Sequence, residues 1–259
     1  MSSFSSDALP GRRVLVTGAT GGIGQAIVRA MAAAGARVAV AGRREAALRD
    51  LAGELGASAE TVLLDVADAA ACRRAVRQVE DAWGGLDVLV NNAGVATSEP
   101  FQELTDEAWR AAFAVNVDGA FHLCQAALPG MVERGFGRLI QIASTAALAG
   151  QSRIAAYTAS KHALLGLTRA LAAEYARSGV TSNCVCPHFV AGPLTERTVA
   201  SIMERTGRDE SAARRPLLTP QGRLIEADEV AAACVYLATT EARSINGQAL
   251  RLDGGWVLA

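Results

Sequence analysis

Short apolar runs alternate with longer segments of helical periodicity along nearly the whole chain of 259 residues. The runs have the length of buried strands and lie at 13–17, 37–41, 61–65, 86–90, 138–143, 180–186 and 248–252. This alternation predicts a doubly wound parallel sheet with helices on both faces. Composition agrees, because 51% of the residues are hydrophobic and only 5% aromatic, as in an aliphatic core between two helix layers. We expect one α/β domain, 1–259.

The first apolar run leads directly into a glycine-rich turn and an apolar helix. The glycines fall at Gly18, Gly22 and Gly24, with Ile23 on the apolar side of the helix. Glycines let the backbone approach a pyrophosphate, and the helix N-terminus offers free N–H groups. The G-x-x-x-G-x-G spacing differs from the usual fingerprint, and no Lys-Ser or Lys-Thr follows, which disfavours a nucleoside-triphosphate loop. The element predicts half of a Rossmann-type dinucleotide-binding unit.

Tyr157 and Lys161 are four residues apart in a segment of helical periodicity, so their side chains share one helix face. A phenol ordinarily titrates near about pH 10, and an adjacent ammonium favours the phenolate. The same spacing also occurs in ordinary half-buried helices. Here Ser144 lies at a strand end thirteen residues before Tyr157, where open α/β sheets place ligands. The pattern favours a general acid or base.

Together with Asn91-Asn92-Ala93-Gly94 and with Asn116, these motifs resemble the classical short-chain dehydrogenase/reductases over about residues 11–255. The resemblance implies reversible hydride transfer between a nicotinamide and a carbonyl carbon. It implies that Tyr157 donates the proton to the nascent alkoxide while Ser144 holds the same oxygen. Lys161 would lower the pKa of Tyr157 and bond the nicotinamide ribose, and Asn116 would help to hold a relay water.

The residues that follow the second strand indicate which nicotinamide cofactor is preferred. Relatives that prefer NAD carry an acidic residue there, which accepts hydrogen bonds from the ribose hydroxyls. Gly42 holds that place here, and Arg43 and Arg44 follow, whose guanidinium groups suit a 2′-phosphate. The arginines could instead be merely solvated, and Thr20 stands where many NADP-using relatives carry Lys or Arg. We expect NADP(H) to be preferred, with NAD(H) possible.

The resemblance implies a cofactor site that extends over several strand ends. Asp65 would face the adenine amino group, and its alternative is a solvated strand end. The expected cofactor contacts are Gly18, Thr20, Gly22, Ile23, Gly24, Arg43, Arg44, Asp65, Val66, Asn92, Ala93, Gly94, Tyr157, Lys161, Pro187 and Val190.

One segment departs from the family pattern. The family usually has Pro-Gly followed four residues later by Thr, whereas here His188 follows Pro187 and Gly192 replaces the threonine. His188 either reaches the substrate as a hydrogen-bond donor or fills a backbone bend. Residues 192–222 are polar and charged, and are expected to form the mobile lid of the family or a solvated helix pair. The candidate substrate residues are Ser144, Gln151, Tyr157, His188 and Leu194.

Other function classes find little support in the sequence. A net charge of −1 does not indicate a basic surface that would bind nucleic acid or an anionic membrane. No stretch approaches the length of a membrane span, and residues 1–12 lack the apolar core of a secretion signal, so we expect a cytoplasmic protein. Five cysteines form no C-x-x-C pair, and we expect buried thiols and no metal.

The sequence therefore predicts an oxidoreductase that interconverts a ketone and a secondary alcohol, with a small-molecule substrate. A 3-oxoacyl or 3-hydroxyacyl thioester is one substrate class, and a free cyclic or hydroxy-acid alcohol is the alternative. A dinucleotide-binding sensor or scaffold without turnover is a different class. By resemblance we expect a homotetramer, with a dimer as the alternative.

Overall fold

A parallel sheet of seven strands organises residues 8–258, the part of the chain that the computed structural model describes. Its order is β3-β2-β1-β4-β5-β6-β7. The strands are β1 (Arg13–Thr17), β2 (Arg37–Gly42), β3 (Ala59–Leu63), β4 (Val88–Asn91), β5 (Gly137–Ile142), β6 (Val180–Pro187) and β7 (Ala249–Leu252). The predicted doubly wound sheet is confirmed, with β3 two residues earlier than expected. Residues 1–7 and 259 lie outside the described residues. Both stretches belong to the expected domain 1–259, and residues 1–7 also belong to the segment 1–12, where we expect no secretion signal.

Alternation along each strand builds two cores, because successive side chains point to opposite faces of the sheet. In β1, Val14 and Val16 face the core beneath α1 and α9, whereas Leu15 faces the core beneath α3 and α5. All three side chains are fully buried. Burial on both faces explains why the strands read as continuous apolar runs rather than as alternating patterns.

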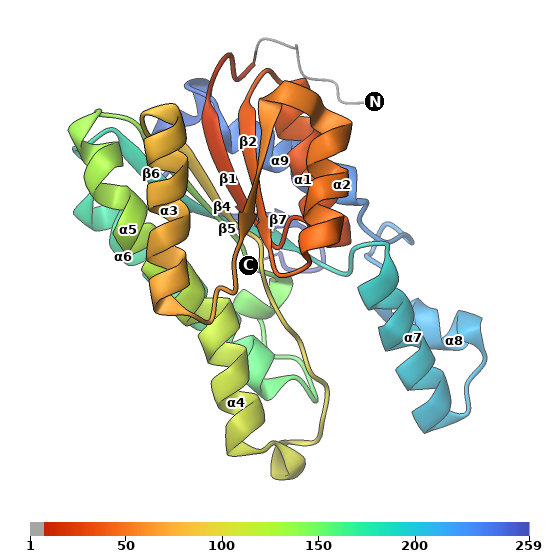
Figure 1. Ribbon diagram of the computed structural model, residues 1–259. Coiled ribbons are helices and arrows are strands. Elements are labelled where there is room, and N and C mark those ends of the chain that lie inside the picture. Colours follow the sequence, from red (N-terminus) through yellow and green to blue (C-terminus); the bar gives the residue numbers. More distant parts are fainter. Residues whose placement is uncertain (1–7, 259) are drawn as a thin grey trace.

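Helices cover both faces of the sheet (Figure 1). On one face, α1 packs against α9, and on the other α3 packs against α5. The α-helices of the described residues are α1 (Gly22–Ala33), α2 (Glu45–Leu55), α3 (Ala69–Trp83), α4 (Asp106–Phe113), α5 (Gly119–Glu133), α6 (Ala155–Glu174), α7 (Pro193–Thr206), α8 (Glu210–Arg214) and α9 (Ala227–Ala238).

The helical segment that follows Thr105 contains a π-helical turn that the sequence did not predict. Thr105 Oγ1 caps α4 by accepting a hydrogen bond from the backbone N–H of Ala108 at 3.1 Å. The π segment Ala114–Asp118 then carries Asn116 and joins α4 to α5. Single π turns inside α-helices are frequent at functional sites.

The carboxyl ends of the strands form the edge where the site residues gather. β1 lies between β2 and β4, so the chain leaves β1 toward one side of the sheet and enters β4 on the other. Ligands of open α/β sheets bind at such a switch point. α4 and the α7–α8 segment extend beyond this edge (Figure 1).

Candidate active site

The glycine turn after β1 packs too closely for side chains. A Cβ on Gly24 would lie 2.2 Å from the carbonyl oxygen of Gly18, and one on Gly18 would lie 2.9 Å from Ala93 Cα. Gly21 precedes α1 and makes no side-chain capping hydrogen bond to it. Uncapped amides at a helix N-terminus suit a phosphate group. The turn therefore fits the pyrophosphate of a dinucleotide.

Asn92 and Thr17 hold this turn against the end of β4. Asn92 Nδ2 donates to the carbonyl oxygens of Thr17 and Gly18 at 2.9 and 3.1 Å. The Thr17 hydroxyl accepts from the backbone N–H groups of Asn92 and Ala93, both at 3.0 Å. The Asn92 side chain thus positions the turn. Thr17 was missed in the sequence, where it reads only as the last residue of a strand.

Two arginines follow β2, and they differ in their contacts. Arg44 Nη2 donates to the Thr20 carbonyl oxygen at 2.8 Å, and its Nε lies 3.3 Å from the Thr20 hydroxyl. Arg43 exposes 72% of its side chain, and its Nη1 lies 3.9 Å from Asp65 Oδ2. Gly42 ends β2 beside them. Arg44 is therefore fixed on the glycine turn, whereas Arg43 is available to a ligand.

Ser144, Tyr157 and Lys161 meet at the carboxyl end of β5. Ser144 precedes the short helix Thr145–Ala147, and its Oγ accepts from the backbone N–H of Ala146 at 3.1 Å. Lys161 is buried on α6, where its Nζ donates to the carbonyl oxygen of Ile142 at 2.8 Å. The same Nζ lies 5.6 Å from the centre of the Tyr157 ring. The structure thus brings the three predicted side chains together.

The pKa of Tyr157 shifts in the direction opposite to the one expected. Burial raises the pKa of the phenol, and a hydrogen bond with Ser144 only partly opposes this shift. Burial also lowers the pKa of Lys161 to about 8, because the ammonium loses its hydration. The expected lowering of the Tyr157 pKa by Lys161 is therefore wrong in this structure, where desolvation is the largest contribution.

Asn116 connects three segments around the lysine. Its Oδ1 accepts from the Val95 N–H, and its Nδ2 donates to the Val95 carbonyl oxygen and to Ser160 Oγ, each at 2.9 Å. A Cβ on Gly94 would lie 3.3 Å from Asn116 Oδ1 and 3.6 Å from Lys161 Nζ. The absence of a side chain at Gly94 therefore leaves room for the amide and the ammonium to lie near each other.

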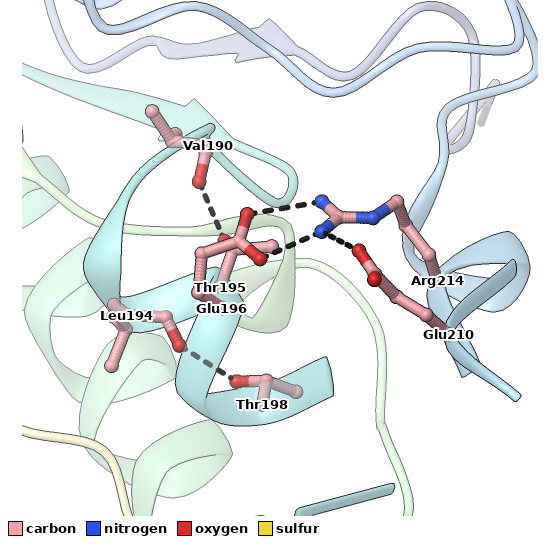
Figure 2. Close-up of polar contacts among 7 residues, drawn as sticks. All are labelled: Val190, Leu194, Thr195, Glu196, Thr198, Glu210 and Arg214. Atoms are coloured by element: carbon pink, nitrogen blue, oxygen red, sulfur yellow. Dashed lines mark hydrogen bonds and ion pairs between the residues drawn. The ribbon is translucent and has the colours of Figure 1, made fainter. Parts of the chain in front are cut away.

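The segment after β6 contains a glycine with an uncommon backbone conformation. Gly192 has φ 141° and ψ −177°, a backbone conformation that essentially only glycine adopts. Close to it, Thr195 Oγ1 donates to the Val190 carbonyl oxygen at 2.5 Å (Figure 2).

His188 is buried and contacts the loop that follows Ser144. Its Nδ1 lies 3.2 Å from Thr145 Oγ1, which in turn lies 3.5 Å from Gln151 Nε2. The imidazole stacks on Trp256 with 4.8 Å between ring centres. Burial lowers the pKa of His188, and the charge of Asp253 partly opposes this. Two of the candidate substrate residues, His188 and Gln151, are thus joined through Thr145.

The remaining expected site residues also lie at or near this edge. Pro187 ends β6 and pairs with Leu252. Val66 is nearly buried after β3, and Ile23 lies in the first turn of α1. Leu194, in the first turn of α7, exposes 57% of its surface.

The described residues contain no cluster of three or more His, Cys, Asp or Glu side chains that could hold a metal ion. Within the same range, no helix is long and apolar enough to cross a membrane. Ser144, Tyr157 and the buried Lys161 lie together at this edge, beside a turn that fits a pyrophosphate. This arrangement can hold a carbonyl oxygen and give it a proton.

Comparison with known proteins identifies the family. The family model described as short chain dehydrogenase matches residues 12–202. The chain belongs to the short-chain dehydrogenase family. This short-chain dehydrogenase is 36% identical to D-beta-hydroxybutyrate dehydrogenase of Cupriavidus necator over 258 residues, which cover 96% of the chain and 99% of that relative.

Two further proteins are similar over nearly the whole chain. A putative ketoacyl reductase 1 of granaticin polyketide synthase from Streptomyces violaceoruber is 40% identical over 250 residues, covering 93% of the chain and 91% of that relative. The crystal structure of a variant actinorhodin polyketide ketoreductase with NADPH has a TM-score of 0.90 and 36% identity, over 97% of this chain and 98% of that chain. The resemblance inferred from the motifs is confirmed. This short-chain dehydrogenase is an alcohol/ketone oxidoreductase of a family that binds NAD(P)H.

Proposed function

We propose that this short-chain dehydrogenase reduces a ketone to a secondary alcohol, reversibly and with NADP(H) as the preferred cofactor. The observation that carries the proposal is the contact group of Ser144, Tyr157 and Lys161 at the carboxyl end of β5. A bound nicotinamide would supply or accept the hydride. The residues of the chain supply the remaining steps.

Tyr157 is the proton donor of the reduction. Because its pKa is raised by burial, the phenol keeps its proton at neutral pH and can give it to the developing alkoxide. Ser144 donates a hydrogen bond to the same oxygen and fixes its place. Lys161 would hold the nicotinamide ribose, and Asn116, which is hydrogen-bonded to Val95, would help to hold a relay water. The oxidation of an alcohol would require the phenolate, so it is favoured at higher pH.

The preference for NADP(H) rests on the end of β2. A Cβ on Gly42 would meet its nearest atoms, Leu48 Cδ2 and Thr20 Oγ1, at 3.7 and 3.9 Å. The backbone at Gly42 therefore leaves room for the Cβ of another residue. Arg43 is exposed beside this position and would bind the 2′-phosphate, while Arg44 holds the turn. NAD(H) would bind without that contact.

The segment 192–222 is proposed as a lid within a single catalytic domain. Arg214 of α8 bonds both carboxylate oxygens of Glu196, at 3.0 and 2.6 Å, and one of Glu210, at 2.9 Å (Figure 2). These ion pairs join α8 to the first turn of α7, so the two helices would move together. Leu194, in that same turn, would then meet the substrate when the lid closes.

The substrate class is proposed from the relatives and from the site. Both a ketoacyl reductase and a D-beta-hydroxybutyrate dehydrogenase are among the similar proteins. The proposed substrate is therefore a 3-oxoacyl thioester or a free 3-oxo acid, with Gln151 and His188 near the end away from Tyr157. A homotetramer is proposed because Trp109 of α4 and Phe121 of α5 remain 39% and 41% exposed.

The function is tested by following the absorbance of the reduced nicotinamide against a panel of ketones, with NADPH and NADH in parallel. The expected result is turnover of 3-oxo esters and thioesters, with a higher kcat/KM for NADPH. A protein that binds NADPH and reduces no member of the panel would be a sensor or scaffold. Equal kcat/KM with both cofactors would reject the proposed preference.

A further inference from the structure

His188 is the outermost of three side chains in a row on one face of β6 and its extension. Alternate residues of a strand share a face, and Cys184 and Cys186 precede His188 on this one. Cys184 Sγ lies 3.1 Å from Thr168 Oγ1 on α6. The backbone N–H of Ser144 faces the Cys186 sulfur. His188 thus lies two residues beyond Cys186, whose sulfur faces the backbone of Ser144.

A chain of polar contacts connects Gln151, Thr145 and His188. Gln151 Nε2 donates to Thr145 Oγ1 at 3.5 Å, which leaves the hydroxyl its proton and one further lone pair. The hydroxyl lies 3.2 Å from His188 Nδ1, so it can donate to this nitrogen or accept from it. In the donating arrangement Nδ1 carries no proton, and the neutral ring is protonated at Nε2.

His188 Nε2 has no hydrogen-bond partner among the described residues, although the atom is buried and the whole residue is only 8% exposed. Buried donors are nearly always hydrogen-bonded in folded proteins. The ring cannot easily turn to find another acceptor, because Trp256 stacks on it and Phe189 meets it edge-on at 5.1 Å. A ligand that brings an acceptor oxygen would satisfy the group.

We propose that His188 Nε2–H binds a second oxygen of the substrate and so selects ketones that carry a carboxylate, ester or thioester carbonyl. The inference rests on the proposed function, because Ser144 and Tyr157 must hold the first oxygen. Gln151 and Thr145 act through His188 as positioning residues, since the donating arrangement of Thr145 sets its tautomer.

The first test observes the tautomer directly. The chain has three histidines, so long-range ¹⁵N–¹H spectra of the ¹⁵N-labelled protein can be assigned with His188→Gln. The expected result is an Nε2–H ring for His188 in the wild type. In Thr145→Val, which removes the hydroxyl at nearly constant shape, part of the population should change to the Nδ1–H form. A wild-type Nδ1–H ring, or a Thr145→Val spectrum without change, would overturn the relay.

The second test compares two substrates, a 3-oxo ester and the methyl ketone of equal chain length. In His188→Phe, the ratio of the two kcat/KM values should fall about two- to tenfold, as expected for one neutral hydrogen bond. His188→Gln keeps an N–H group near the position of Nε2 and should retain most of the ratio. Retained NADPH binding shows that each variant is folded.

An unchanged ratio in His188→Phe, or an equal loss in His188→Gln, would reject the selection of a second oxygen. A wild type that reduces neither ketone would instead reject the proposed function. In that case, the spectra would still decide whether His188 presents a donor, and titration with a 1,3-dicarbonyl compound should shift its Nε2–H resonance. A resonance that does not move would reject the binding proposal.

Discussion

Arg44 bonds back to Thr20 across the glycine turn, with 2.8 Å between its Nη2 and the threonine carbonyl oxygen. Arg43, its neighbour in sequence, makes only a long contact with Asp65 at 3.9 Å. One arginine is therefore part of the turn that both cofactors would use. The other is placed to distinguish them.

Arg43→Ala should raise KM for NADPH and leave KM for NADH nearly unchanged. The expected cost is about 1.5–3 kcal/mol, the usual contribution of a hydrogen bond to a charged group. Arg44→Ala is the matched control and should weaken both cofactors, because it loosens the turn. Kinetics with the two cofactors measures the difference, and an equal loss of both in Arg43→Ala would make that residue structural.

Gly42→Asp should change the preference toward NADH. An added Cβ has room at this position, and a carboxylate would accept bonds from the ribose hydroxyls and repel a 2′-phosphate. The ratio of kcat/KM for NADH to that for NADPH should rise at least about tenfold, which corresponds to about 1.4 kcal/mol. Gly42→Asn tests the charge, and it should give a smaller change.

Tyr157→Phe should remove turnover while NADPH still binds, because the ring and the Lys161 contact remain. General acid catalysis is typically worth about 10²–10⁴-fold in rate. Stopped-flow kinetics measures the rate of ketone reduction, and a binding titration measures the affinity for NADPH. A variant that keeps more than about a tenth of kcat would show that another group donates the proton.

Lys161→Met should change how stability depends on pH. In the folded protein the pKa of Lys161 is lowered to about 8, whereas its ordinary value is 10.5. Between these two pH values the unfolded chain binds more protons, so the contribution of Lys161 to stability rises with pH.

From pH 8 to 10, the free energy of unfolding of the wild type should therefore rise relative to that of Lys161→Met. The expected rise is roughly 2–3 kcal/mol. Urea unfolding of both proteins without cofactor measures it. The difference between the proteins is used because buried Cys72 and Cys124, whose pKa values are raised to about 11, act in the opposite direction in each.

Gly192→Ala should destabilise the protein by about 1–3 kcal/mol, because a φ of 141° is strained for any side chain. Gly166→Ala is the matched control, since this glycine lies inside α6 with no atom within 4 Å of an added Cβ. That change should stabilise by about 0.5–1 kcal/mol through helix propensity. Thermal unfolding measures both, and equal effects would contradict the strain at Gly192.

The sequence could predict the catalytic group because several motifs occur together in the order and spacing of a known family. A step of four residues on a helix places Tyr157 and Lys161 on one face, whereas the position of Ser144 beside them was implied by the resemblance to the short-chain dehydrogenase/reductases. The π segment around Asn116 could not be predicted, because it depends on bonds to Val95 and Ser160, which are far apart in the chain. The direction of the Tyr157 pKa likewise depends on burial, which is a property of the packed structure.

The hydrogen bonds of two threonine hydroxyl groups could not be predicted either. Thr17 bonds residues 75 and 76 positions away, and Thr145 meets a histidine 43 positions away. A threonine in an apolar run gives no local sign of such a partner. Glycine at 192 could be noticed as a departure, but its conformation could be found only from the backbone.

The ion pairs of Arg214 also bear on how the enzyme could be redesigned. Glu210 lies on α8, yet it shares the Arg214 guanidinium with Glu196, two residues after Leu194. A substitution at Glu210 can therefore change the angle at which the first turn of α7 meets a ligand. Directed evolution of substrate scope should include this helix, since acceptance of bulkier ketones can arise from positions that no ketone contacts.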